Sequence, residues 1–177
     1  MTPEIVLPAH CLVVLIGAAG SGKSTFAARW FEPAEILSSD AYRARVGRGE
    51  DDQAATGRAF RALHAELTAR LREGRIAVVD ATNIRSEDRR ALLRRAAAVG
   101  APAVAVVFEM SLRECLEGDR DRPGRHVAPE VIERQWTRLQ TALDRPAAIG
   151  DEGFGAVHRL VGHIARQSAV VRREQVR

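Results

Sequence analysis

The sequence predicts an α/β fold in which a parallel sheet carries helices on both of its faces. Three observations support this fold class. Continuous apolar runs at 11–16, 75–80 and 103–109 are typical of strands that are buried on both faces. Segments with helical spacing of apolar residues separate these runs along the chain. A glycine-rich stretch follows the first run, as expected where a strand turns directly into a helix.

Each element is predicted from its apolar spacing and its end signals. Ser86 is the expected N-cap of one helix, and Ser111 with Glu114 forms a capping box for the next. Gly74 and Gly100 are the expected helix terminators. The predicted strands are 11–16, 35–38, 75–80, 103–109 and a last one near 154–160. The predicted helices are 25–30, 41–46, 56–72, 86–99, one that opens at Ser111 and one from Pro129 toward Pro146.

The composition favours one domain with a substantial core, since 46% of the 177 residues are hydrophobic. We expect a domain over 1–162, followed by a basic C-terminal tail over 163–177. The sequence has no apolar run long enough for a membrane span and no signal-peptide pattern. Cys11 and Cys115 lack ligand or redox spacing, so packed thiols in a reducing cytoplasm are expected. The net charge of +4 is compatible with a polyanionic partner but carries little weight alone.

A single lysine marks the most informative segment of the chain. Of the 27 lysines and arginines, only Lys23 is a lysine, and it lies in the run Gly-Ala-Ala-Gly-Ser-Gly-Lys-Ser at 17–24. This run fits G-x-x-x-x-G-K-[ST], the phosphate-binding P-loop, in which backbone N–H groups surround phosphates and the hydroxyl binds Mg²⁺. A compact ammonium suits this position better than a planar guanidinium. The residues predicted to bind the ATP phosphates are Gly17, Ala18, Ala19, Gly20, Ser21, Gly22, Lys23, Ser24 and Thr25.

Carboxylates follow the ends of three further predicted strands, namely Asp40, Asp80 and Glu109. Ligands bind at the carboxyl ends of strands in such sheets, so these groups should converge on the edge that carries the P-loop. Asp40 is a candidate to accept the proton of an attacking hydroxyl and to orient it, or it caps the helix at 41–46, or both. Arg43, one helical turn later, is a candidate to hold an acceptor phosphate.

Two further features have a functional and a structural interpretation. Asp80 ends an apolar strand, so it is a candidate to support the metal with Ser24; the alternative is a hydrogen-bonding role with Thr82 and Asn83. An arginine-rich stretch at 119–126 carries the candidate ATP-binding residues Arg120, Arg122 and Arg125. Arginines in such a loop can close on the γ-phosphate, whereas the alternative is a solvated charged loop.

Five motifs together resemble the kinase domain of bacterial polynucleotide kinase-phosphatase, an RNA end-healing enzyme. They recur in the same order and at comparable spacing, and the resemblance covers about residues 10–160. The P-loop alone is common to many kinases, whereas the combination of S-S-D-x-x-R and V-D-A-T-N is more selective. The motifs are GAAGSGKSTF at 17–26, S-S-D-x-x-R at 38–43, D-Q-x-x-T-G at 52–57, V-V-D-A-T-N at 78–83 and A-V-V-F at 105–108.

The resemblance implies an adenylate-kinase-like P-loop fold with an arginine-rich lid. It also implies transfer of the γ-phosphate of ATP, with Mg²⁺, to the 5′-OH end of RNA or DNA. Asp40 would be the general base, Arg43 would contact the transferring or acceptor phosphate, and Asp80 would support the metal. Arg122 and Arg125 match lid positions, whereas Gly118 stands where the family has its upstream lid arginine, unless Arg120 takes over that task. The resembled enzyme continues into phosphatase and ligase domains, so separate proteins are expected to supply those activities.

Two other functions remain open from the sequence. A small-molecule kinase on the same fold, acting on a sugar acid or an antibiotic, would require a closed acceptor pocket. A nucleotide-dependent switch would require an effector region, which is not evident in the sequence, and it would not need a base where an acceptor binds.

Overall fold

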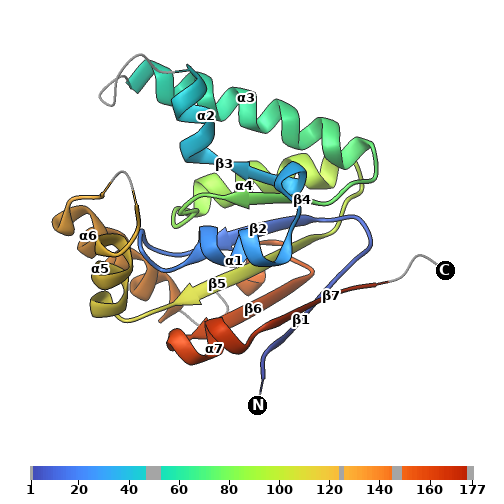
Figure 1. Cartoon of the computed structure of the whole chain (residues 1–177). Helices are drawn as coiled ribbons and strands as arrows, with labels where there is room; N and C mark the ends of the chain where they lie inside the picture. The colour runs from blue at the N-terminus through green and yellow to red at the C-terminus, as the bar shows by residue number, and fades with distance from the viewer. Residues whose placement is uncertain (1, 47–52, 124–125, 145–148, 175–177) are drawn as a thin grey trace.

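The computed structural model describes residues 2–46, 53–123, 126–144 and 149–174, and it has the expected α/β architecture (Figure 1). A five-stranded sheet in the order β3-β4-β2-β5-β6 has parallel pairing throughout. Its strands are β2 (Leu12–Ile16), β3 (Ile36–Ser38), β4 (Ala77–Asp80), β5 (Ala103–Glu109) and β6 (Ala156–Val161). The fold class predicted from the sequence is therefore confirmed.

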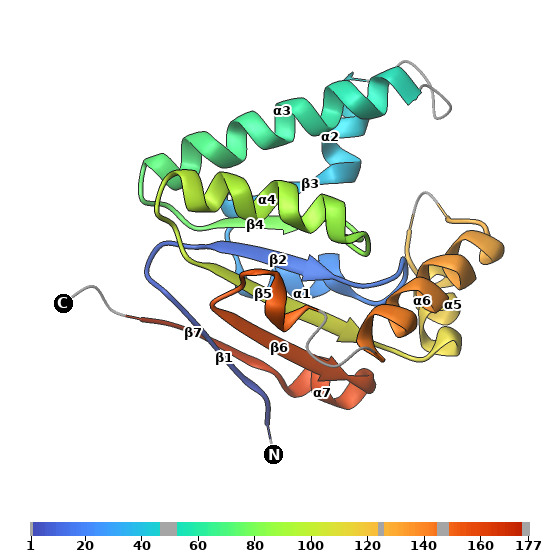
Figure 2. The same ribbon diagram turned by 180° about the vertical axis from the view of Figure 1, so that it is seen from behind.

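Helices lie on both faces of this sheet and at the carboxyl ends of its strands (Figures 1 and 2). Helices α3 and α4 lie together on one face, whereas α1 packs on the other. Helices α5 and α6 lie side by side near the carboxyl end of β5. The helices are α1 (Lys23–Trp30), α2 (Ser39–Val46), α3 (Gln53–Arg72), α4 (Ser86–Ala98), α5 (Leu112–Arg120), α6 (Pro129–Leu143) and α7 (Gly162–Ser168), with short 3-10 turns η1 (Pro33–Glu35) and η2 (Gly150–Glu152).

The core consists of two apolar layers, one on each face of the sheet. Successive side chains of a strand point to opposite faces, so each central strand contributes to both layers. In β2, Leu12 and Val14 pack toward α3 and α4, whereas Val13 and Leu15 pack toward α1. The continuous apolar runs in the sequence arise from this burial on both faces.

A second, two-stranded sheet was not anticipated from the sequence. Strand β1 (Glu4–Leu7) pairs in parallel with β7 (Val170–Arg173), and α7 precedes β7. The segment that the sequence analysis assigned to a basic tail therefore contains a helix and a strand over 162–173. Ile5 and Leu7 of β1 are fully buried in the layer that includes α1, which anchors this segment to the core.

Several predicted helix ends are confirmed, and one is wrong. Ser111 accepts a hydrogen bond from the Glu114 N–H, and the Glu114 carboxylate accepts one from the Ser111 N–H, as the capping box requires. Gly74 and Gly100 have positive φ values of 67° where α3 and α4 end. Ser86 is not the N-cap of α4 because the cap position is Arg85, with no side-chain hydrogen bond to the helix.

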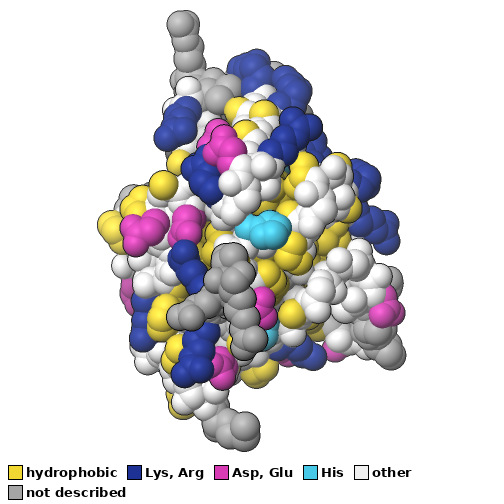
Figure 3. Space-filling view, turned by 90° about the vertical axis from the view of Figure 1, so that its right-hand side faces the viewer, with side chains coloured by type: hydrophobic (Ala, Val, Ile, Leu, Met, Phe, Trp, Pro, Cys, Tyr) yellow, Lys and Arg dark blue, Asp and Glu magenta, His cyan; other side chains and the backbone are white. Residues whose placement is uncertain are grey.

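The amino ends of the strands lie at the opposite end of the molecule from the P-loop. This face mixes basic, acidic and apolar side chains, and basic ones gather on its upper part, at the height of α3 (Figure 3). Among the described residues, no helix combines the length and apolar character needed to cross a membrane.

Candidate active site at the carboxyl edge of the sheet

The P-loop connects β2 to α1 and has the backbone form that phosphate binding needs. Ser21 N–H donates to the Ala18 carbonyl at 3.2 Å, which closes a tight turn, and Gly20 and Gly22 have φ values of 74° and 87°. Such φ values favour glycine. No side chain caps the start of α1 at Gly22, so the first N–H groups of that helix stay available for an anion. The predicted P-loop is confirmed as a loop between a buried strand and a helix.

Lys23 lies across this loop and is almost fully buried, with 7% of its surface exposed. Its Nζ donates to the Ala18 carbonyl at 2.7 Å and to Ser21 Oγ at 3.2 Å. Burial lowers the pKa of Lys23 to about 8, while the Asp80 carboxylate opposes this shift. The ammonium therefore lacks full compensation in the free protein, and a bound polyphosphate would supply the missing negative charge.

Asp80 ends β4 beside the P-loop, where it interacts with Ser24 and Lys23. It is 8% exposed, and burial raises its pKa, whereas a hydrogen bond from Ser24 and the charge of Lys23 act in the opposite direction. Ser24 itself is exposed at the start of α1. A carboxylate and a hydroxyl thus adjoin each other at the place where the phosphates of a nucleotide would lie.

Asp40 lies in the first turn of α2, where β3 ends, and its side chain is 59% exposed. It forms an ion pair with Arg43, which also donates to Ser39 Oγ at 3.3 Å. Asp40 and Arg122 both act on the pKa of Lys23, Asp40 raising it and Arg122 lowering it. The structure therefore brings the predicted catalytic residues toward one site, with the Arg43 guanidinium on the Asp40 carboxylate.

The alternative role of Asp40 as a helix cap is wrong. Helix α2 begins at Ser39, so Asp40 lies inside its first turn, and the Ala41 N–H donates to Ser38 Oγ at 3.4 Å. Ser38 therefore occupies the position expected of the cap. The exposed Asp40 carboxylate therefore does not cap the helix, although its negative charge in the first turn interacts favourably with the helix dipole.

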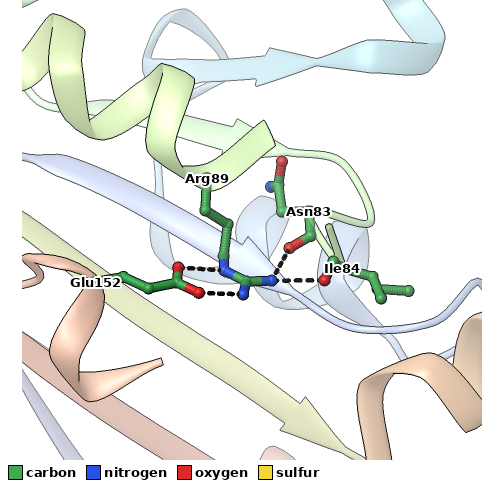
Figure 4. Close-up of polar contacts among 4 residues, drawn as sticks. All are labelled: Asn83, Ile84, Arg89 and Glu152. Carbon is green, nitrogen blue, oxygen red and sulfur yellow. Dashed lines mark hydrogen bonds and ion pairs between the residues drawn. The ribbon is translucent and has the colours of Figure 1, made fainter. Parts of the chain in front are cut away.

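A buried polar network holds the loop after Asp80 in place. Asn83, with a φ of 48°, donates from Nδ2 to the Leu15 carbonyl at 2.8 Å and so connects β2 with the end of β4. Arg89 of α4 is 2% exposed, and its Nη1 donates to the carbonyls of Asn83 and Ile84 (Figure 4). Its Nε and Nη2 bind both carboxylate oxygens of Glu152. The structural interpretation of Asn83 is therefore confirmed.

The other side of the P-loop packs directly on the backbone of α5. A Cβ atom added to Gly118 would lie 2.2 Å from the Gly20 carbonyl oxygen, and one added to Gly20 would lie 1.8 Å from the Cys115 carbonyl oxygen. Gly118 thus marks the contact between helix and loop, and no side chain fits there. An arginine at this position, where the resembled family has its upstream lid arginine, would require α5 to move away from the P-loop.

The arginine-rich stretch follows α5, and Asp119 forms hydrogen bonds with residues at its far end. This residue is 4% exposed; its Oδ2 accepts a hydrogen bond from the Val127 N–H at 3.0 Å, and its carbonyl lies 2.8 Å from His126 Nδ1. Arg120 is the last residue of α5 and is exposed. The charge of Arg122 lowers the pKa of both Lys23 and Asp80, so Arg122 lies in the neighbourhood of the P-loop. Arg125, the third predicted lid arginine, lies outside the described residues, as does Asp52.

Two residues that no motif indicated also contact the P-loop. Gln135 of α6 accepts a hydrogen bond from the Ala19 N–H at 2.9 Å. Arg166 of α7 donates to the Ser21 carbonyl at 3.1 Å and pairs with His163 Nδ1 at 2.7 Å. Both lie more than a hundred residues from the loop in the sequence, so only a prediction of tertiary contacts could have found them.

The packing of Gly118 gives a testable prediction. Gly118→Ala should reduce the free energy of unfolding by about 1–3 kcal/mol, because the added methyl group overpacks a backbone contact that cannot yield without moving the P-loop. Nucleotide affinity should fall as well. The checks are thermal melting and calorimetric titration with ADP. Gly57→Ala on α3 is the control: its nearest neighbour is the end of Arg61, at 3.7 Å, so a gain of about 0.5–1 kcal/mol is expected. Equal behaviour of the two variants would contradict this account.

The fold and this loop define a P-loop nucleotide-binding domain of the kinase type. The chain belongs to the family described as an AAA domain, whose model matches residues 12–146. A comparison with curated proteins finds no match.

Solved structures share the fold at low sequence identity. A chain of the Pnkp1/Rnl/Hen1 RNA repair complex is 24% identical with a TM-score of 0.64; the match covers 79% of this chain and 45% of that one. The APS kinase of Mycobacterium tuberculosis is 19% identical with a TM-score of 0.55; the match covers 92% of this chain and 95% of that one. A gluconokinase from Sinorhizobium meliloti is 16% identical with a TM-score of 0.52; the match covers 88% of this chain and 84% of that one. These likenesses confirm the fold, and two of the matched structures, the APS kinase and the gluconokinase, are small-molecule kinases by name.

Proposed function

We propose that this chain is a polynucleotide 5′-kinase, which transfers the γ-phosphate of ATP to the 5′-OH end of RNA or DNA. The observation that carries the proposal is the exposed Asp40 carboxylate at the end of β3, on the same edge as Lys23 and Asp80. An acceptor hydroxyl that approaches a phosphate held on the P-loop would meet this carboxylate. The similarity in fold to a chain of an RNA repair complex supports this choice of acceptor.

In this proposal each residue has a distinct task. Lys23 and the N–H groups at the start of α1 hold the β- and γ-phosphates. Asp40 accepts the proton of the 5′-hydroxyl and aligns its oxygen with the γ-phosphorus, while the bond from that phosphorus to the ADP oxygen breaks. Arg43 stays beside Asp40 and binds the transferring or acceptor phosphate. Arg122 approaches from the lid, together with Arg120 and Arg125, and offsets the charge of the phosphates.

The residues at the P-loop also fit a magnesium ion. Ser24 and Asp80 supply oxygen donors, which Mg²⁺ prefers. Within the described part of the chain, no cluster of three His, Cys, Asp or Glu side chains could hold a metal by itself. This arrangement suits Mg²⁺, which commonly binds through one or two protein oxygens together with substrate phosphates. When bound, the ion would neutralise charge on the phosphates.

Two further aspects belong to the same proposal. The matched RNA-repair chain is about twice as long as the matched region, which covers 45% of it. We therefore include phosphatase and ligase activities as partners in end healing and sealing. A cytoplasmic location remains the expectation from the two cysteines, both of which are buried and unpaired.

The competing candidate is a small-molecule kinase, which the similarity to a gluconokinase and to a sugar kinase favours. A panel of acceptors separates the two. With γ-labelled ATP and Mg²⁺, label should appear on 5′-OH oligonucleotides and not on gluconate, sugars or nucleosides. Oligonucleotide affinity should also fall with rising salt, because phosphate contacts release counterions. Label on a small hydroxyl compound alone, with salt-insensitive binding, would overturn the proposal.

Two arginines of α2 provide a matched pair of variants for this assay. Arg43→Ala should raise the KM for the oligonucleotide or lower turnover, with ATP affinity little changed, because Arg43 lies beside Asp40. Arg45→Ala is the control, since the Arg45 guanidinium lies over the ring of Tyr42, 5.5 Å from its centroid. Equal losses in both variants would indicate a general effect of charge.

A further inference from the structure

Gln135 links the helix that follows the arginine-rich stretch to the P-loop. Its Oε1 accepts the Ala19 N–H at 2.9 Å, although 116 positions separate the two residues in the sequence. Gln135 is half-buried on α6, two turns after Pro129. This contact holds a peptide group inside the phosphate-binding loop through a neutral amide.

The position of Ala19 indicates which phosphate lies near this amide. Lys23 donates to the carbonyl of Ala18, the residue directly before Ala19. The P-loop lysine reaches the β- and γ-phosphates, whereas the start of the following helix holds the inner phosphates. The peptide group between Ala18 and Ala19 therefore lies at the γ-phosphate end of the loop, and Gln135 reaches that end from α6.

A glutamine has the right chemistry for this position. Its carbonyl oxygen accepts one hydrogen bond, and its NH₂ group carries two donors on the same planar amide. Because Oε1 binds the Ala19 N–H, the NH₂ group of the same amide also lies next to the P-loop. A glutamate would keep the acceptor but would place a negative charge and no donor there. A leucine would lose both functions.

We propose that Gln135 is a specificity-determining residue that recognises the γ-phosphate: Oε1 holds the Ala19 N–H while Nε2 donates to a γ-phosphate oxygen. This inference rests on the proposed use of the P-loop in phosphoryl transfer. Gln135 thereby distinguishes ATP from ADP. It also connects the γ-phosphate to the arginine-rich stretch, because that stretch lies between α5 and α6 and is tied at Val127 by Asp119.

The test compares two nucleotides that differ at the γ-position, with no acceptor present. Calorimetric titration would give the affinities of wild-type, Gln135→Glu and Gln135→Leu for ADP and for the non-hydrolysable ATP analogue AMPPNP, each with Mg²⁺. Gln135→Glu should weaken AMPPNP binding about 10-fold or more, as expected for a lost hydrogen bond to a charged group, and change ADP affinity by less than about twofold. Gln135→Leu should also lower the ratio of AMPPNP to ADP affinity. Gln140→Glu, on the same helix, is the control and should leave both affinities unchanged.

Two outcomes overturn the inference. An unchanged ratio of AMPPNP to ADP affinity in Gln135→Glu, including equal weakening of both nucleotides, would mean that Gln135 only supports the P-loop, because glutamate preserves the acceptor for Ala19. Failure of the wild-type to bind either nucleotide would refute both this inference and the kinase proposal, whereas failure of polynucleotide acceptors alone would leave the ratio test intact. Thermal melting checks each variant, and if Gln135→Leu does not fold, the near-isosteric Gln135→Glu decides.

Discussion

Lys23→Arg is expected to abolish phosphoryl transfer, with a loss of at least about 10²-fold, although the positive charge is retained. Lys23 is nearly fully buried, and its Nζ makes two short contacts, to the Ala18 carbonyl and to Ser21 Oγ. A guanidinium is wider and planar, so it cannot occupy this space without displacing the turn of the P-loop. The same loss is expected for Lys23→Ala, which removes the charge instead.

The measurement is single-turnover transfer from γ-labelled ATP, together with nucleotide affinity and thermal melting. Arg29→Lys at the exposed end of α1 is the control for an exchange of basic residues; it contacts the Gln167 carbonyl and should retain transfer. The fold should stay intact in all variants. Near-wild-type turnover by Lys23→Arg would show that this position needs only a positive charge.

Asp40→Asn should bind ATP with Mg²⁺ normally and lose about 10²–10⁴-fold in the rate of transfer to a 5′-OH end. The amide keeps the shape of the side chain but loses the charge that attracts the hydroxyl proton and aligns the oxygen. Stability should change by at most about 1 kcal/mol, because the ion pair with Arg43 lies at the surface. Since Ser38 caps α2, the substitution does not remove a helix cap.

This prediction is checked by single-turnover transfer to a 5′-OH oligonucleotide, with melting and nucleotide affinity measured in parallel. Asp88→Asn is the matched control, since Asp88 is also an exposed carboxylate in the first turn of a helix, α4. It should leave transfer unchanged. If Asp40→Asn transferred phosphate at the wild-type rate, the proton acceptor would have to be another group at this edge.

The sequence was most informative where function depends on local backbone geometry. The P-loop needs glycines, a lysine and a hydroxyl at set spacing within eight residues, so its motif could be recognised directly. The parallel sheet followed from apolar runs, because strands buried on both faces consist almost entirely of apolar residues. Convergence of Asp40 and Asp80 on the P-loop edge followed from the direction of parallel strands, and the structure brings both toward Lys23.

Short segments with a weak residue pattern could not be predicted from local spacing and strand direction. The four-residue strands β1 and β7 pair with each other from opposite ends of the chain, and neither has a turn signal that links it to its partner. Asp40 was a plausible cap by residue type, but the helix begins at Ser39, two residues earlier than predicted, which places Ser38 at the cap. Arginine is a residue type usually found at the surface, yet Arg89 is buried because it pairs with Glu152, which lies 63 positions away in the sequence.

The sequence by itself determined the fold class, the nucleotide loop and the residues at the carboxyl edge of the sheet, because each follows from local spacing and strand direction. Only the tertiary structure decided what surrounds the loop. Gly118 packs on Gly20, Gln135 holds the Ala19 N–H, and Arg166 binds the Ser21 carbonyl. These contacts join segments about a hundred or more residues apart, and their partners are backbone groups, which every residue carries and no sequence pattern distinguishes.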